Sequence, residues 1–161
     1  MKKNIHIISH THWDREWYMP FEYHRARLID LLDVCMKMLE TDADFKSFHL
    51  DGHTALIEDY LEVKPQNKEK LKKYISEGKI KVGPGYVLQD VFFTSSEANI
   101  RNLLTGMKVA EEFGKVNMIG YFPDSFGNAG QMPQILKQAG MKAIVFGRGV
   151  KPTGVSNTVS D

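Results

Sequence analysis

Hydrophobic and polar positions along the chain follow two patterns: short apolar runs, and longer stretches in which apolar residues recur every three to four positions. The first apolar run, Lys3–Ser9, predicts a β-strand. The stretch Arg25–Glu40 carries leucines spaced with a period of about 3.6, beginning with Leu28 and Leu32. This spacing predicts an amphipathic helix directly after the first strand.

The same two patterns continue along the chain and predict further strands and helices in alternation. The further strands are expected at Phe45–Leu50, Lys79–Val82, Met118–Phe122 and Lys142–Phe146. The further helices are expected at Thr54–Glu62, at Gln66–Glu77, from a start signal at Thr94–Glu97 up to Gly114, and at Pro133–Ala139. Gly78 follows one of these helices, where a left-handed cap is expected.

The start signal at Thr94–Glu97 fits a capping box, in which the Thr94 hydroxyl and the Glu97 carboxylate accept hydrogen bonds from free backbone amides. The apolar face of the helix that follows is expected to consist of Ile100, Leu103, Leu104 and Met107. This face should turn toward the core.

Strands that alternate with helices predict βαβ units and a parallel sheet. We therefore expect an α/β fold built from parallel βα repeats, as part of an incomplete, barrel-like (β/α) catalytic domain. The tail Gly149–Asp161 is polar and contains no sixth strand or helix, and a closed barrel could not end there. We expect residues 1–161 to be the amino-terminal part of a larger catalytic domain.

Composition narrows the class of protein. Of 161 residues, 42% are hydrophobic and 25% are charged, as is usual for globular proteins. Lysine and arginine total 21 against 20 acidic residues, which leaves no basic surplus for nucleic acid or an anionic membrane. No stretch approaches the length of a membrane span or a signal peptide, so a cytoplasmic protein is expected. The single cysteine, Cys35, is interpreted as a core residue.

Polar residues follow each of the predicted strands. They are, in chain order, His10, His12 and Asp14, then Asp51, Asp90, Asp124 and Arg148. Because the carboxyl ends of parallel strands share one edge, where ligand sites of α/β proteins lie, these residues predict one composite site.

The first of these clusters, His10–Trp17, combines imidazoles, carboxylates and indoles within eight residues. In an extended segment the side chains of His12 and Asp14, two positions apart, point the same way. Zinc accepts both imidazole nitrogen and carboxylate oxygen. This cluster is therefore interpreted as a metal or catalytic site, with a tryptophan-rich strand end as the structural alternative.

The second cluster, Gly120–Asn128, places Asp124 among aromatic residues at a strand end. An aromatic face packs against the C–H groups of a sugar while a carboxylate meets its polar or reacting atoms. Alternatively, Asp124 caps the next helix. Arg148 is either a surface arginine or a cation that acts on a nearby carboxylate.

These two clusters, together with Phe146–Arg148, resemble the amino-terminal catalytic domain of the family 38 glycoside hydrolases, the retaining, metal-dependent α-mannosidases, and the bacterial branch in particular. The resemblance implies that His12, Asp14 and Asp124 bind one zinc ion. A fourth ligand, a histidine, and the general acid/base would come from outside this segment, so the segment alone is expected to be inactive.

The resemblance also implies that Asp124 is the catalytic nucleophile, which forms a glycosyl intermediate. The remaining matched residues would contact the substrate: Trp17 and Phe126 line the sugar subsite and Arg148 lies beside the nucleophile. His10 matches no ligand and is expected behind the metal site. The substrate implied is terminal α-linked mannose in oligosaccharides, with the metal on the 2- and 3-hydroxyls.

Two other functions stay open at this stage. A metal-dependent amidohydrolase or deacetylase also carries a His-x-His motif after the first strand of an α/β barrel, but would want a histidine where Arg148 stands. A non-catalytic carbohydrate-binding module would not need a metal-ligating acid at Asp124. An incomplete barrel would also expose sheet edges, which invite association, so a homo-oligomer is a further alternative.

Overall fold

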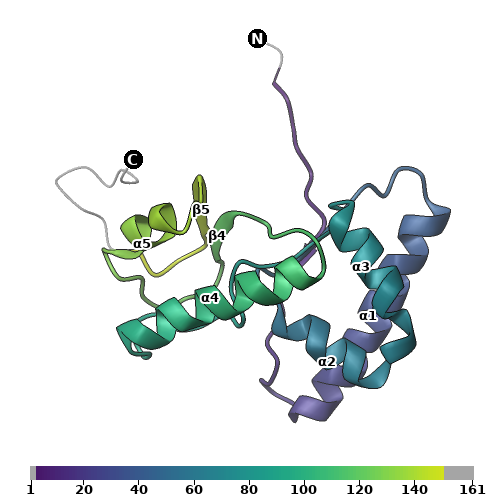
Figure 1. Ribbon diagram of the computed structural model, residues 1–161, viewed down its shortest axis with the longest axis horizontal. Coiled ribbons are helices and arrows are strands. Elements are labelled where there is room, and N and C mark those ends of the chain that lie inside the picture. The colour runs from purple at the N-terminus through teal and green to yellow at the C-terminus, as the bar shows by residue number, and fades with distance from the viewer. Residues whose placement is uncertain (1–2, 151–161) are drawn as a thin grey trace.

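The structure, a computed structural model, describes residues 3–150. Within this range, parallel strands alternate with helices, which confirms the expected α/β class (Figure 1). The strands are β1 His10–Thr11, β2 Phe48–Leu50, β3 Ile80–Lys81, β4 Ile119–Phe122 and β5 Ala143–Phe146. The helices are α1 Phe21–Thr41, α2 Ala55–Val63, α3 Lys68–Ser76, α4 Ser96–Glu112 and α5 Met132–Gln138, with a 3-10 turn, η1, at Pro65–Asn67.

The strands form two parallel sheets, where one continuous sheet was expected. One sheet has the order β1-β2-β3 and the other pairs β4 with β5. Local contacts join the two sheets: the Asn117 amide N–H donates to the Val82 carbonyl over 2.9 Å, and the centre of the Tyr121 ring lies 4.7 Å from that of the His49 ring in β2. The strand ends that carry the polar residues therefore still face one region.

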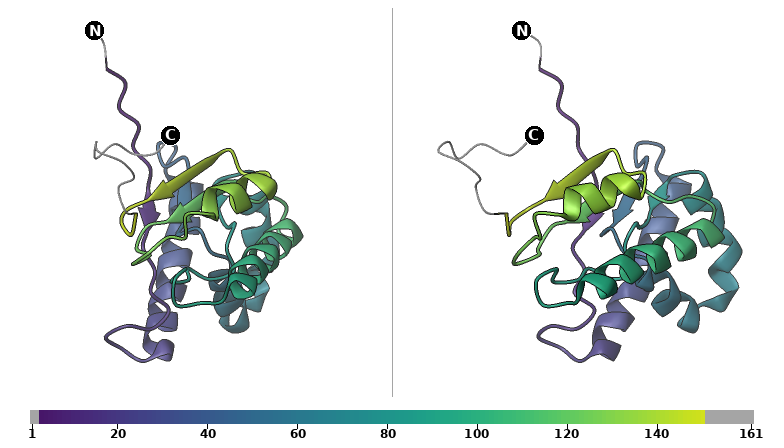
Figure 2. Two further views of the ribbon diagram at one scale, coloured as in Figure 1. Left: turned by 90° about the vertical axis from the view of Figure 1, so that its left-hand side faces the viewer. Right: turned by 60° about the vertical axis from the view of Figure 1, so that its left-hand side comes forward.

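The prediction of a strand at Lys3–Ser9 is wrong. Residues 3–9 form an extended segment that runs out from the body of the molecule, with Ile5 and Ile7 largely exposed (Figures 1 and 2). The strand begins only at His10 because its neighbour β2 is three residues long. The hydrogen bond from the His49 amide to the Ser9 carbonyl is the first one between the two segments. Within the described part of the chain, residues 3–8 have no neighbouring strand with which to pair.

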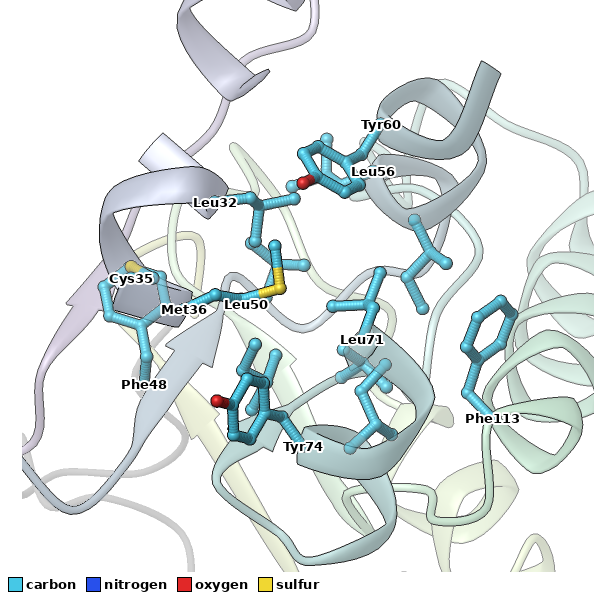
Figure 3. Close-up of a cluster of buried hydrophobic side chains, with 14 of the residues drawn as sticks. Leu32, Cys35, Met36, Phe48, Leu50, Leu56, Tyr60, Leu71, Tyr74 and Phe113 are labelled. Carbon is cyan, nitrogen blue, oxygen red and sulfur yellow. The ribbon is translucent and has the colours of Figure 1, made fainter. Parts of the chain in front are cut away.

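The larger core lies between α1, α2, α3 and the three-stranded sheet (Figure 3). Leu28 and Leu32 of α1 are fully buried there, as their spacing predicted, and Cys35 is a buried member of the same cluster. A smaller core joins α4, α5 and the β4-β5 sheet. None of the helices within residues 3–150 combines the length and apolar character that a bilayer crossing needs.

Helix α4 differs from its prediction in both its cap and its buried face. The cap is Ser95, whose hydroxyl accepts from the Ala98 amide over 3.1 Å, rather than Thr94. Leu104 is 60% exposed, whereas Gly106 is buried. A Cβ added to Gly106 would lie only 2.1 Å from the backbone of Gly85. The helix turns its small residues inward because it packs directly on the backbone of the loop after β3.

That loop is held in place by a polar residue of α4. The side-chain amide of Asn102 donates to the Val87 carbonyl and accepts from the Val87 amide, each over 2.9 Å. This pairing resembles that of neighbouring strands, and it continues the loop beyond the parallel bridge between Gly85 and His53. It fixes the residues from 88 to 90 at the same edge as the ends of the other strands.

Candidate active site

A cavity of about 260 Å³ lies beyond the carboxyl ends of the strands. Every residue to which the resemblance gave a metal-binding, catalytic or substrate-binding role lines it, namely His12, Asp14, Trp17, Asp124, Phe126 and Arg148. The cavity also takes in Leu88, Gln89 and Asp90 from the loop that α4 holds in place. Of the strand-end residues expected to form one composite site, His12, Asp14, Asp90, Asp124 and Arg148 share this cavity, whereas His10 and Asp51 do not line it.

Three donor atoms meet on one side of this cavity. His12 Nε2 is 3.6 Å from the nearest oxygen of Asp14 and 3.7 Å from the nearest oxygen of Asp124. As they stand, no three or more histidine, cysteine, aspartate or glutamate side chains within residues 3–150 are grouped so that they could hold a metal ion. The donors nevertheless lie close to the separation of about 3.4 Å that two ligands have in a tetrahedral zinc site, so their chemistry and spacing fit the ion.

The other nitrogen of His12 faces Asp51, at the end of β2. The distance from Nδ1 to Asp51 Oδ2 is 3.1 Å, and the same oxygen accepts from the backbone amide of Trp13. Burial raises the pKa of Asp51 to about 6, against the opposing effects of the Trp13 amide and of His12. The side chain of His12 is therefore held from behind, with Nε2 directed at the two carboxylates.

Asp124 uses its two oxygens on different partners. Oδ2 faces His12, and Oδ1 lies 2.5 Å from Arg148 Nη2. The arginine reaches this position because Gly147 and Gly149 flank it: a Cβ at either would meet a carbonyl oxygen of the loop after β4, at 2.3 and 2.2 Å respectively. The two loops touch only because these positions are glycine.

Aromatic residues form the open rim of the cavity. Trp17 is 73% exposed and Phe126 is 58% exposed, which is unusual for large apolar side chains and typical of a ligand-binding surface. Arg148 lies over the Phe126 ring at 4.3 Å from its centre. The Phe126 amide donates to Asp90 Oδ1 over 3.3 Å, which gives Asp90 a supporting role at this rim.

Sequence reasoning placed Asp51 at the site's edge but gave it no role, and it expected His10 behind the metal site instead. His10 is exposed and its ring contacts only the carbonyl of Thr11 among the described residues. Asp51 occupies the place expected of His10. Its signal in the sequence was the Asp51–Gly52 pair, which is typical of a turn with positive φ.

Two buried histidines lie beneath the site. Burial lowers the pKa of His49 to about 4 and that of His53 to about 3. Both rings are therefore neutral at physiological pH. His49 Nε2 contacts the side-chain amide of Asn117 at 3.1 Å, and His53 Nε2 lies 3.9 Å from Asp51.

The arrangement suits chemistry on a polar, ring-shaped ligand. The half-exposed carboxylate of Asp124 lines the cavity, with the guanidinium of Arg148 on one side and the imidazole of His12 on the other. Aromatic faces stand at the entrance for the C–H surface of a sugar. The cavity has the features of an active site rather than of a flat binding surface.

Comparisons with known proteins agree on one family. The family model described as "Glycosyl hydrolases family 38 N-terminal domain" matches residues 2–150 of this chain. The "Putative mannosylglycerate hydrolase" of Halalkalibacterium halodurans is 58% identical over 160 residues, 99% of this chain and 18% of that protein. "Alpha-mannosidase 2C1" of Mus musculus is 28% identical over 140 residues, 86% of this chain and 13% of that protein.

A solved structure shows the same fold. The crystal structure of an alpha-mannosidase from Enterococcus faecalis has a TM-score of 0.87 and 52% sequence identity, over 90% of this chain and 16% of that one. The chain thus spans less than a fifth of the length of the relatives that it matches.

Proposed function

The chain belongs to glycosyl hydrolase family 38, and we propose that the intact protein is a retaining, metal-dependent α-mannosidase that cleaves terminal α-linked mannose. The observation that carries this proposal is the placement of Asp124, which shares one cavity with His12, Asp14 and Arg148. Neither rival reading accounts for this placement as simply. An amidohydrolase would want a histidine where Arg148 meets Asp124, and a binding module would not need the carboxylate there.

In the proposed reaction Asp124 is the nucleophile. One of its oxygens forms a bond to the anomeric carbon of mannose while the bond to the leaving-group oxygen breaks, and a general acid outside the described residues protonates that oxygen. Water then cleaves the glycosyl–Asp124 ester, giving mannose and the free carboxylate, while the same acid/base group takes up the proton that water loses. Arg148, in contact with Oδ1, holds the carboxylate in one orientation through both steps.

We propose that His12, Asp14 and Asp124 hold a zinc ion, with a fourth ligand from outside the described residues. The spacing of the donors around His12 Nε2 supports this assignment. When bound, the ion would supply positive charge for recognising the sugar hydroxyls and for stabilising the charge that develops on the ring. Trp17 and Phe126 would pack against the apolar face of the same sugar.

We also propose that the two sheets are consecutive parts of a barrel-like domain. Within each sheet the strands follow chain order and run parallel, as neighbours in a (β/α) barrel do. A doubly wound sheet would instead reverse its order near the first strand.

A small, charged mannoside is a second candidate substrate. It is favoured by the 58% identity with the relative named for mannosylglycerate, in which the leaving group would be glycerate rather than another sugar. The chemistry at Asp124 is the same for both substrates. The leaving group alone distinguishes them.

The test is an assay of the intact protein with aryl α-mannoside, mannose disaccharides and mannosylglycerate, before and after treatment with a chelator. We expect release of mannose that is lost on chelation and lost in Asp124→Ala. Wild-type turnover by Asp124→Ala would remove the nucleophile assignment. Activity on amides in place of mannosides would favour the amidohydrolase.

A further inference from the structure

We propose that Asp51 is a positioning residue for the metal site: it fixes the ring of His12 and the backbone of Trp13 so that Nε2 of His12 and the carboxylate of Asp14 face the same ion. This inference deepens the proposed function and rests on it, because it takes His12 and Asp14 to be ligands. The evidence is the geometry at the end of β2.

The first observation is the pair of contacts that Asp51 makes. One carboxylate oxygen, Oδ2, is 3.1 Å from His12 Nδ1 and also accepts from the Trp13 amide. The second oxygen lies 3.4 Å from the same imidazole nitrogen. A single side chain therefore holds both the ring of one proposed ligand and the peptide that leads to the other.

The second observation is that Asp51 is buried away from the cavity and has few basic partners among the described residues. Its side chain is fully buried, so it neither meets solvent nor reaches the cavity, and it is absent from the cavity lining. Among residues 3–150, the basic side chains with a nitrogen within 4 Å of its carboxylate are those of His12 and His53. Burying a carboxylate costs free energy unless it is hydrogen-bonded or paired. The contacts with His12 and Trp13 are therefore the interactions that offset the burial of Asp51.

The third observation is that the backbone is held in an unfavourable shape to make these contacts. Asp51 has a φ of +42°, and it is the one residue other than glycine with a positive φ in the part of the chain that the structure describes. Such conformations persist where surrounding packing enforces them, and they cluster at functional sites.

The neighbour of Asp51 explains how the shape is enforced. Gly52 has a φ of +68°, and a Cβ on it would lie 2.7 Å from the Tyr121 ring. Its carbonyl also accepts from the Gly85 amide over 3.1 Å. The turn is therefore clamped between the two sheets, and the carboxylate of Asp51 is aimed rather than free to rotate.

The chemical consequence concerns the tautomer of His12. A carboxylate beside Nδ1 accepts a hydrogen bond from it, so Nδ1 carries the proton. The lone pair is then left on Nε2, the atom that faces Asp14 and Asp124. The negative charge behind the ring also strengthens Nε2 as a donor to a metal. Loss of Asp51 should thus weaken metal binding without removing any ligand.

The experiment measures the zinc dissociation constant of the intact protein by competition with a chromophoric chelator. Asp51→Asn keeps one acceptor oxygen but loses the charge, whereas Asp51→Ala loses both. We expect the dissociation constant to rise about tenfold in Asp51→Asn and about a hundredfold in Asp51→Ala. The melting temperature of the chelator-treated variants separates this effect from general damage to the fold.

The matched control is Asp59→Asn. Asp59 is also a buried aspartate, and it holds the same segment through two hydrogen bonds of 2.7 Å from Arg15, but it contacts no proposed ligand. We expect this variant to bind zinc like the wild type.

A second control, Asp14→Ala, tests the metal site itself. If Asp14→Ala weakens zinc binding while both Asp51 variants bind like the wild type, the role of Asp51 is refuted and the site stands. If Asp51→Ala melts earlier without zinc but keeps the wild-type dissociation constant, its role is structural only, which also refutes the inference. If Asp14→Ala has no effect, the proposed metal site fails first, and the role of Asp51 fails with it.

Discussion

Acid should destabilise this protein through two buried histidines beneath the site. The ordinary pKa of histidine, about 6.5, applies in the unfolded chain, whereas burial lowers the pKa of His49 to about 4 and that of His53 to about 3 in the folded state. Above pH 6.5 both rings are neutral in either state, so the folded protein has its full stability. Below pH 6.5 these histidines bind protons in the unfolded chain but stay neutral in the folded protein, so the free energy of unfolding falls.

The magnitude follows from the width of that window. At pH 5, which is about 1.5 pH units below the unfolded pKa, each histidine should reduce the free energy of unfolding by about 2 kcal/mol. Asp51 acts in the opposite direction. Its pKa is raised to about 6, so the folded state gains a proton first and is stabilised by about 1 kcal/mol at pH 5.

The assay is denaturant unfolding at pH 8 and at pH 5, comparing the wild type with His49→Gln and with His53→Gln. Because Asp51 is present in every variant, its contribution cancels in the comparison. Each variant should lose about 2 kcal/mol less than the wild type between the two pH values, while the exposed His6→Gln should match the wild type. Equal losses in all four proteins would refute the reasoning.

Packing and substrate contacts give four more expected outcomes. Gly106→Ala should lower the free energy of unfolding by about 2 kcal/mol despite the better helix propensity of alanine, whereas Gly130→Ala, with open space around it, should be nearly neutral; denaturation midpoints decide. Arg148→Lys should reduce kcat/KM on an aryl α-mannoside about tenfold, because lysine cannot both contact Asp124 and stack on an aromatic ring; unchanged kinetics would contradict a role for that contact. Trp17→Ala should raise KM about fivefold and leave kcat nearly unchanged, as expected if its exposed ring only binds the sugar, and a kcat loss of the same size would argue against this. Chelation should abolish turnover and added zinc should restore it, so chelator-resistant activity would exclude the metal.

The helices were predictable because their signals are local. The leucine spacing in α1 places Leu28 and Leu32 in the core, and the φ of +70° at Gly78 confirms the expected cap after α3. Residues 3–9 were not predictable in this way. Their apolar character favours a strand, but a strand also needs a partner, and the length of β2 is invisible in the sequence of residues 3–9.

The predicted buried face of α4 was only partly right, for a related reason: Leu103 and Met107 pack in the smaller core, but Leu104 does not. Hydropathy selects the largest apolar residues, and Leu104 was among them, but the contact is made by Gly106 against the backbone of Gly85. An approach between two backbones leaves no apolar pattern. It is visible only when both segments are placed in space.

The gathering of the site could be predicted because parallel strands bring their ends to one edge, whichever residues they carry. This rule located His12 and Asp124 at a common cavity although more than a hundred positions separate them. It could not tell which way a side chain points. Asp51 turns inward because of its positive φ, and this conformation depends on Tyr121, a residue of another sheet.

In the proposed metal site, the packing of Tyr121 against Gly52 would let one side chain influence ion choice. His12 and Asp14 follow β1 of the three-stranded sheet and Asp124 follows β4 of the two-stranded one, so the phenol ring would act as a spacer between the two parts of the proposed donor set. Zinc favours bonds of about 2.0–2.2 Å and calcium about 2.3–2.6 Å, a difference that a slight shift of one sheet would cover. We therefore expect a library of substitutions at position 121 to yield enzymes that prefer larger cations, without altering any group that touches the ion.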